Sequence, residues 1–158
     1  MGTEAIKFTV MGNPIPQPRV VDDTRKQRKY NLSYMPKFDP AAKKKVNFGL
    51  KALVHRPDTP FNCPLEVNIT FCFKRPDGHY GRQNGQPYLK PDSPEWHTTK
   101  TGDIDNLDKF VLDSLTGANF WTDDKLVCRQ RLEKRYTCKL PCTEIEIIPL
   151  EEKGLFDE

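Results

Sequence analysis

The segment PLEVNITFCFK, residues 64–74, alternates apolar and polar side chains along its whole length. A two-residue period places every second side chain on the same side of an extended chain. The pattern therefore predicts a β-strand with one apolar face, and it is the strongest single constraint on the fold. The residues on that face are Leu65, Val67, Ile69, Phe71 and Phe73.

Three further segments have the character of strands. Residues 5–11 alternate and are followed by GNPIPQPR, whose prolines cannot donate to a strand ladder. Residues 125–137 and 142–150 are joined by a short connection that contains KLP, at 139–141, and this connection predicts an antiparallel hairpin between them.

Two segments are predicted to be helices. The first spans 39–55, with Asp39 as N-cap, Pro40 at the first helical position and an apolar stripe. The second spans about 105–115 and is followed by Thr-Gly. The predicted stripe of the first helix is Ala42, Val46, Phe48, Leu50, Leu53 and Val54; that of the second is Ile104, Leu107, Val111 and Leu115.

The elements follow one another in the order strand, helix, strand, helix, strand, strand. A chain of 158 residues fits one domain, because single cores commonly hold about 100 to 200 residues. We therefore predict an α+β fold, a small mixed sheet packed with two main helices. The single domain spans 1–158, with a core of about 5–150, a long loop at 75–102 and a flexible tail at 151–158.

Carboxylates crowd the start of the second predicted helix, in GDIDNLDK at 102–109. Asp105 and Lys109 are four residues apart and share a helix face, and Asp103 precedes them closely. The turn FWTDDK adds Asp123 and Asp124, which a chain returning antiparallel to the helix can bring toward its beginning. Three carboxylate oxygen donors with water are a typical Mg²⁺ site, and phosphodiester hydrolysis is its natural chemistry.

Acidic clusters also occur where no Mg²⁺ is bound. An EF-hand beginning at Asp103 requires Gly at its sixth position and Glu at its twelfth, where this chain has Asp108 and Ser114, so it is excluded. Capping and the helix dipole alone account for one or two acids at a helix start. Paired carboxylates also serve glycoside hydrolases, although such sites do not need the neighbouring Lys109.

Basic residues are concentrated elsewhere, in RKQRK at 25–29 and KKK at 43–45, although the net charge is only +3. Separate basic and acidic regions are typical of a protein that binds a polyanion with its basic residues and acts on it at an acidic site that binds metal. Alternatively, the basic clusters are simply part of the solvated surface. Tyr80, Tyr88 and Trp96 either stack on unpaired bases or hold the long loop in place. The predicted DNA-binding residues are Arg19, Arg25, Lys26, Arg28, Lys29 and Lys100.

The five cysteines lack the spacing of a zinc site, and the sequence has no apolar run typical of a signal peptide or a membrane span. We therefore expect free thiols and a reducing, cytoplasmic location.

Arg129, Arg131 and Arg135 share one strand face. Across the predicted hairpin, Glu144 and Glu146 are expected to neutralise them, which favours a structural role for this stripe.

Residues 97–127 closely resemble the signature of the RusA family of Holliday junction resolvases. The shared elements are Asp-x-Asp-Asn-Leu-x-Lys, Leu-Asp-x-Leu-x-Gly and an aromatic residue before Asp-Asp; GNPIPQPR at 12–19 resembles the family's Gly-x-Pro-x-Pro start. One departure is Thr101-Gly102 where family members commonly have proline, which leaves the phosphate role of Lys100 open.

The resemblance implies a homodimer that cuts four-way DNA junctions with Mg²⁺, for which Mn²⁺ can substitute, in recombination and repair in a bacterium or phage. Carried over by position, Asp103, Asp105 and Asp124 are its metal ligands and Lys109 its catalytic lysine. Asn106 and Asp123 are supporting residues, and Asp113 is at least as well explained by a structural role. The alternatives are a metal-dependent nuclease for flaps or other branched DNA, and a catalytically silent junction-binding protein.

Overall fold

The computed structural model describes residues 4–18, 40–100 and 102–152 of the chain. It confirms the mixed α+β class, with a four-stranded sheet and two main helices. The strands are β1 (Ile6–Met11), β2 (Leu65–Lys74), β5 (Val127–Thr137) and β6 (Cys142–Pro149), and the helices are α2 (Ala42–Ala52) and α3 (Ile104–Gly117).

Strand β2 lies in the interior of the sheet, whose order is β1-β6-β2-β5. It pairs in parallel with β5 and antiparallel with β6, so β5 and β6 are separated by β2. The predicted hairpin between these two strands is therefore wrong. Parallel neighbours need a long crossover, and the connection through α3 supplies it between β2 and β5.

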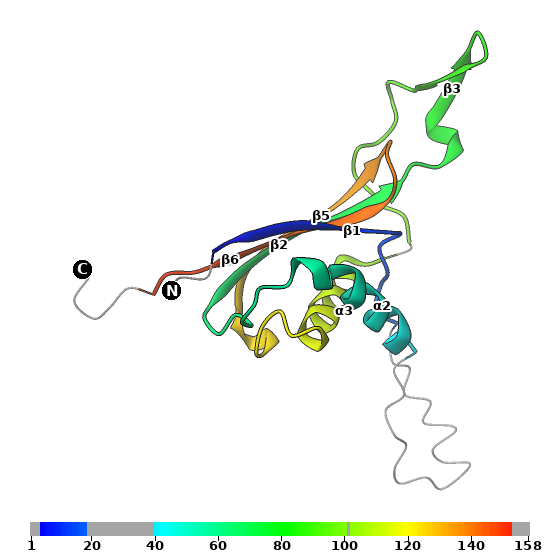
Figure 1. Ribbon diagram of the computed structural model, residues 1–158. Helices are drawn as coiled ribbons and strands as arrows, with labels where there is room; N and C mark the ends of the chain where they lie inside the picture. The colour runs from blue at the N-terminus through cyan, green and yellow to red at the C-terminus, as the bar shows by residue number, and fades with distance from the viewer. Residues whose placement is uncertain (1–3, 19–39, 101, 153–158) are drawn as a thin grey trace, which may run out of the picture.

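Both helices cover the same face of the sheet, and the opposite face is open, as Figure 1 shows. The apolar face of β2 points toward the helices: Leu65, Val67, Ile69 and Phe71 are buried, as predicted, and Phe73 is partly buried. From α3, Leu107, Val111 and Leu115 join this core, while Ile104 remains exposed. The α3 stripe was thus predicted correctly except at its first residue.

The predicted stripe of α2 is confirmed only at Phe48, which is partly buried and packs edge-on against Phe110 of α3. The fully buried residues are the small ones, Gly49 and Ala52, whereas Val46, Leu50 and Val54 are 61%, 61% and 84% exposed. Gly49 allows a close approach to α3, since an added Cβ would lie 3.2 Å from the Ala118 Cβ and 3.3 Å from the Ser114 carbonyl oxygen.

The start of α2 also differs from the prediction. Ala41 is the N-cap and makes no side-chain capping hydrogen bond, and Pro40 precedes the helix. Asp39, the predicted N-cap, lies outside the described residues. The helix ends at Ala52 and continues as a 3-10 turn to His55, which matches the predicted end.

The segment 75–102, predicted to be a loop, contains a second sheet. Strands β3 (Tyr80–Gln83) and β4 (Gln86–Leu89) form an antiparallel hairpin that projects beyond the end of the main sheet (Figure 1). Asn84 and Gly85 form its turn, both with positive φ, +52° and +75°, as a two-residue hairpin turn requires. No helix in the described ranges combines the length and apolar character that a membrane crossing requires.

Candidate active site

The start of α3 carries the acidic motif on an exposed surface. Asp103 occupies the N-cap position and Asp105 the first turn, and both are exposed. The Asp103 side chain makes no capping hydrogen bond, so capping does not account for this carboxylate. Lys109, one turn after Asp105, is also exposed, and neither Asp105 nor Lys109 forms an ion pair with another residue that the structure describes.

The chain enters α3 through a buried glycine. Gly102 has φ +98°, which favours glycine, and an added Cβ would lie 3.3 Å from a Leu107 methyl group. The Lys134 ammonium, on β5, donates a 3.0 Å hydrogen bond to the Gly102 carbonyl oxygen. The sheet therefore fixes the backbone immediately before Asp103.

The proline-rich segment after β1 lies against the same end of α3. The Gln17 backbone N–H donates to the Asn106 carbonyl oxygen at 2.9 Å, and Gln17 is buried. The two parts of the sequence that resemble the RusA signature, 12–19 and 97–127, are thus in contact at this point. Their motifs indicated one family, but neither motif predicted that the two segments touch.

The second pair of acids lies in the 3-10 turn that leads into β5. Asp123 accepts a 2.9 Å hydrogen bond from the Lys125 backbone N–H, which is the main cause that lowers its pKa. Asp124 begins the turn and is exposed, yet loss of water around its carboxylate raises its pKa. The hydrogen bond and charge of Asp123 and the charge of Asp113 raise that pKa further.

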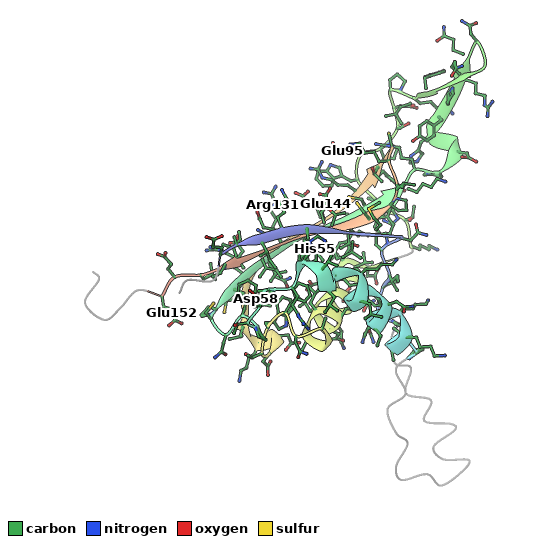
Figure 2. The ribbon with its side chains drawn as sticks, viewed as in Figure 1. His55, Asp58, Glu95, Arg131, Glu144 and Glu152 are labelled. Atoms are coloured by element: carbon green, nitrogen blue, oxygen red, sulfur yellow. The ribbon has the colours of Figure 1, made fainter. Side chains whose placement is uncertain are left out.

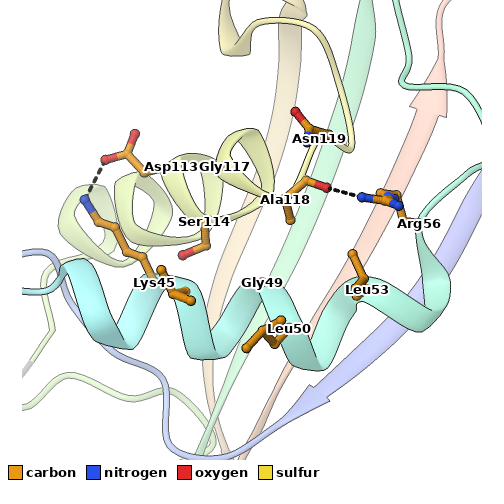
Figure 3. Close-up of a pocket in the computed structure, with 11 residues that line it drawn as sticks. Lys45, Gly49, Leu50, Leu53, Arg56, Asp113, Ser114, Gly117, Ala118 and Asn119 are labelled. Carbon is orange, nitrogen blue, oxygen red and sulfur yellow. Dashed lines mark hydrogen bonds and ion pairs between the residues drawn. The ribbon is translucent and has the colours of Figure 1, made fainter.

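Asp113 lies in the second half of α3 and forms a 3.0 Å ion pair with Lys45 of α2 (Figure 3). This pair supports the structural role considered for Asp113. Its charge contributes to the raised pKa of Asp124, after burial and the influence of Asp123. Asp113 belongs to the second half of α3, and Asp103 and Asp105 lie at its beginning.

In the described part of the chain, the oxygens of Asp103, Asp105 and Asp124 do not form a group within 4.8 Å of one another. Their joint binding of a metal stays a prediction. Asp103 and Asp105 fit Mg²⁺ by donor chemistry, since both are exposed carboxylates, and Mg²⁺ prefers oxygen ligands and retains waters.

One compact group of metal-capable side chains lies on the open face of the sheet, formed by Cys72, Cys142 and Glu144. Cys72 and Cys142 are directly opposite on β2 and β6, both buried and free. Burial, followed by the influence of Cys142, raises the pKa of Cys72 to about 12. Two thiols are soft donors, so this group does not suit Mg²⁺.

The arginine stripe on β5 is neutralised by different carboxylates from those predicted. Arg129 pairs with Glu66, and Arg135 pairs with both Glu133 (2.9 Å) and Glu95 (2.7 Å). Arg131 also pairs with Glu133, at 3.0 Å. Because β2 separates β5 from β6, the predicted partners Glu144 and Glu146 are not the ones used; Figure 2 shows Arg131 and Glu144 on the open side of the sheet.

Of the predicted DNA-binding residues, only Lys100 is described, and its side chain is exposed. The others, Arg19, Arg25, Lys26, Arg28 and Lys29, lie outside the described residues.

The aromatic residues of the segment 75–102 differ from one another. Trp96 packs under the Arg135 guanidinium, 4.4 Å from the ring centroid, while Tyr88 belongs to β4 and is 46% exposed.

Asp108 provides a pH-dependent test of the packing between α3 and β5. Its Oδ1 accepts a 2.9 Å hydrogen bond from Gln130, and burial raises its pKa above the ordinary 3.8. The folded protein therefore binds this proton more tightly than the unfolded chain. The ionised carboxylate costs stability at neutral pH, and this cost disappears as the pH falls through the folded pKa toward 3.8.

We expect Asp108→Asn to raise the unfolding free energy at neutral pH, because the amide oxygen still accepts from Gln130 and carries no charge. The gain should shrink on acidification and vanish below pH 3.8, where the carboxyl group is neutral in both states. Denaturant unfolding of the wild type and of Asp108→Asn, from neutral pH to below pH 3.8, measures this difference in unfolding free energy. A gain that is the same at neutral and acidic pH is inconsistent with the burial of this charge.

A family model described as endodeoxyribonuclease RusA matches residues 12–148, which is most of the chain. No significant match was found among curated proteins.

Proposed function

The chain belongs to the RusA family of endodeoxyribonucleases, and from this membership we propose that it resolves four-way DNA junctions by paired symmetric nicks in a divalent-metal-dependent reaction. The observation that carries the proposal is the extent of the family match. It includes the segment that follows β1, all of α3 and the acidic turn before β5. Recombination and repair of DNA, in the cytoplasm of a bacterium or encoded by a phage, are the processes that we propose it serves.

The proposed metal ligands are Asp103, Asp105 and Asp124, with Mg²⁺ as the ion and Mn²⁺ as a substitute. When bound, the ion would supply Lewis-acid stabilisation of the negative charge that develops on the phosphoryl oxygens. The exposure of Asp103 and Asp105 supports their part, because a DNA phosphate can approach them without a change in the fold.

Lys109 is proposed to lie beside the scissile phosphate. Four residues on a helix advance about 6 Å, so its ammonium is one turn beyond Asp105. An ammonium placed there offsets negative charge in the transition state and partly balances the carboxylates. Asn106 supports this arrangement through its backbone, which binds Gln17. Asp123 is proposed as a supporting residue because it directly precedes Asp124 and its carboxylate is fixed by the Lys125 backbone N–H.

Binding of the DNA backbone is proposed to come from cations outside the acidic site. Phosphate contacts of Lys and Arg supply most of the sequence-independent affinity for DNA. The residues proposed are Arg19, Arg25, Lys26, Arg28, Lys29 and Lys100. We also propose a homodimer, because a four-way junction has two-fold symmetry and a C2 dimer presents one site to each of two symmetric strands.

The test is incubation of the protein with a labelled mobile four-way junction, a flap and a linear duplex, each with and without Mg²⁺. We expect two symmetric incisions in the junction, little cutting of linear duplex and none without the metal. Preferential cutting of the flap would support the alternative of a nuclease for other branched DNA. Binding without incision in Mg²⁺ would support a silent junction-binding protein, and cleavage unaffected by EDTA would contradict the metal-dependent mechanism.

A further inference from the structure

The β3–β4 hairpin is a built projection with an exposed tip. Each residue from Arg82 to Asp92 is exposed. The strands are held in register from the Tyr80–Leu89 pair to the Gln83–Gln86 pair next to the turn. The Tyr88 ring lies over Gly81 on the facing strand, so closely that an added Cβ there would lie 2.5 Å from the ring. An aromatic ring over a cross-strand glycine stiffens a two-stranded ribbon.

The base of the hairpin is fixed to the main sheet. The buried Arg75, directly after β2, donates a 2.6 Å hydrogen bond to the Pro94 carbonyl oxygen. The His79 carbonyl oxygen accepts from the Lys90 backbone N–H and from the Ser93 hydroxyl, at 3.0 and 2.7 Å. The His79 ring packs edge-on against Tyr136 of β5. The hairpin therefore has a defined direction relative to the sheet.

A continuous set of hydrogen bonds links this base to the start of α3. The segment after the hairpin runs along β5, where the Tyr136 N–H donates to Glu95 and the His97 N–H donates to Lys134, at 2.9 and 3.1 Å. The Lys134 side chain then binds the Gly102 carbonyl oxygen, next to Asp103. The hairpin and the acidic motif are consequently held at the same end of β5.

The side chains at the tip of the hairpin are cationic or carry amides, which suits contact with DNA. From Tyr80 to Lys90 the charged residues are Arg82 and Lys90, both cationic; the nearest acids, Asp77 and Asp92, lie outside the two strands, at the base of the hairpin. The remaining tip side chains include Gln83, Asn84 and Gln86, which are exposed amides. Arginine and the amide side chains are the groups that bind guanine and adenine edges in the major groove.

The dimensions of the hairpin also match that groove. Paired strands lie about 4.8 Å apart, and four residues of a strand extend about 14 Å. The major groove of B-DNA is about 12 Å wide and 8.5 Å deep, and it admits a two-stranded β-ribbon. The tip can therefore reach the base edges while the base of the hairpin stays outside the groove.

We infer that the β3–β4 hairpin enters the major groove of a duplex arm beside the cleavage position and contacts base edges through Arg82, Gln83 and Gln86. This inference rests on the proposed function, and it makes the hairpin responsible for preferring certain DNA sequences near the cleaved phosphodiester. The carboxylates at the start of α3 would serve the cleavage, and the hairpin would bind the bases of the adjoining arm.

The test uses dimethyl sulfate, which methylates guanine N7 in the major groove, on junctions bound by the Asp105→Asn protein. We expect protection of guanines in one arm at saturating protein. In the same background, Arg82→Ala with Gln83→Ala and Gln86→Ala should abolish the protection and weaken binding about tenfold or more. Lys7→Ala, which removes an exposed cation from β1, is the matched control and should retain the protection.

Protection that is absent, or unchanged in the triple variant, overturns the inference. Thermal unfolding of the triple variant should match the parent protein, because the substituted side chains are exposed. Wild-type incision of the same junction in Mg²⁺ is measured in parallel. If incision occurs and the hairpin protects no guanine, only the hairpin's role is wrong. If wild-type protein neither binds nor cuts the junction, the proposed function fails, and the inference fails with it.

Discussion

Asp105→Asn is expected to lower the rate of junction cleavage in Mg²⁺ by at least about 100-fold while junction binding persists. Loss of residues that only support metal ligands typically costs 10- to 100-fold, so loss of a proposed ligand should cost at least as much. The substitution removes one negative charge from an exposed position in the first turn of α3, outside the buried core. Single-turnover cleavage and a binding titration of the same junction measure the two quantities.

The matched control is Asp58→Asn, which removes the same charge from an exposed residue between α2 and β2 (Figure 2). This variant should cut at the wild-type rate. If Asp105→Asn also cuts at that rate, Asp105 has no part in the reaction. If it loses junction binding together with cleavage, the carboxylate acts in DNA binding or folding rather than in the chemical step.

Trp121→Ala is expected to lower the unfolding free energy by about 3 to 5 kcal/mol, the usual cost of removing a large aromatic side chain from a core. Trp121 is 1% exposed, and its indole N–H donates a 2.7 Å hydrogen bond to the Thr116 hydroxyl oxygen. The backbone on either side is bound to Phe61, through Phe120 at 2.9 Å and Thr122 at 3.0 Å. These contacts fix the end of α3 and the acidic turn that follows.

Denaturant unfolding measures this change. Leu140→Ala, at a residue 71% exposed in the connection between β5 and β6, is the control and should shift stability by no more than about 0.5 kcal/mol. A loss below about 1 kcal/mol for Trp121→Ala would contradict the packing described for this region.

The strands and α3 could be predicted because their patterns are local and strong. The alternation in β2 indicated the correct buried face, and the stripe of α3 was correct from Leu107 onward. The separation of β5 from β6 in the sheet could not be deduced in the same way. A short connection favours a hairpin, but β2 lies between these two strands in the sheet. This strand order depends on tertiary packing and not on the connection.

The α2 helix was predicted, but most of its buried face was not, because the helix approaches α3 closely through small residues. Gly49 lies next to Ala118 and Ser114, and of the larger predicted residues only Phe48 packs against α3, on Phe110. The larger Val46 and Leu50 instead line an open groove of about 260 Å³ between the two helices (Figure 3). Hydrophobicity alone does not identify such a contact.

The β3–β4 hairpin had a signal in the sequence. Asn84-Gly85 is a strong indicator of a two-residue hairpin turn, but the flanking strands have four residues each and little apolar alternation. The surrounding prolines and glycines favoured a loop. The short strands are explained by their position, because a ribbon exposed on all sides has no apolar face to bury.

The sequence predicted a helix that begins among two acids and a lysine, and the structure confirms that helix and shows Asp103, Asp105 and Lys109 exposed at its start. Their joint part in a metal site stays a prediction. Asp124 follows the end of α3, which is at Gly117 rather than near residue 115, and begins the 3-10 turn before β5. The charge of Asp113 contributes to the raised pKa of Asp124, an influence that spacing in the sequence does not reveal.

Asp103 and Asp105 are proposed to hold the divalent ion that serves cleavage, and every other part of the proposed reaction depends on that ion. Anomalous diffraction from crystals of the protein bound to a junction and soaked in Mn²⁺ would locate it. We predict a manganese peak within coordination distance of the carboxylates of Asp103, Asp105 and Asp124, with DNA phosphate oxygens and water completing the ligand set. A peak between Asp113, Asp123 and Asp124 alone, or none beside the start of α3, would contradict this assignment.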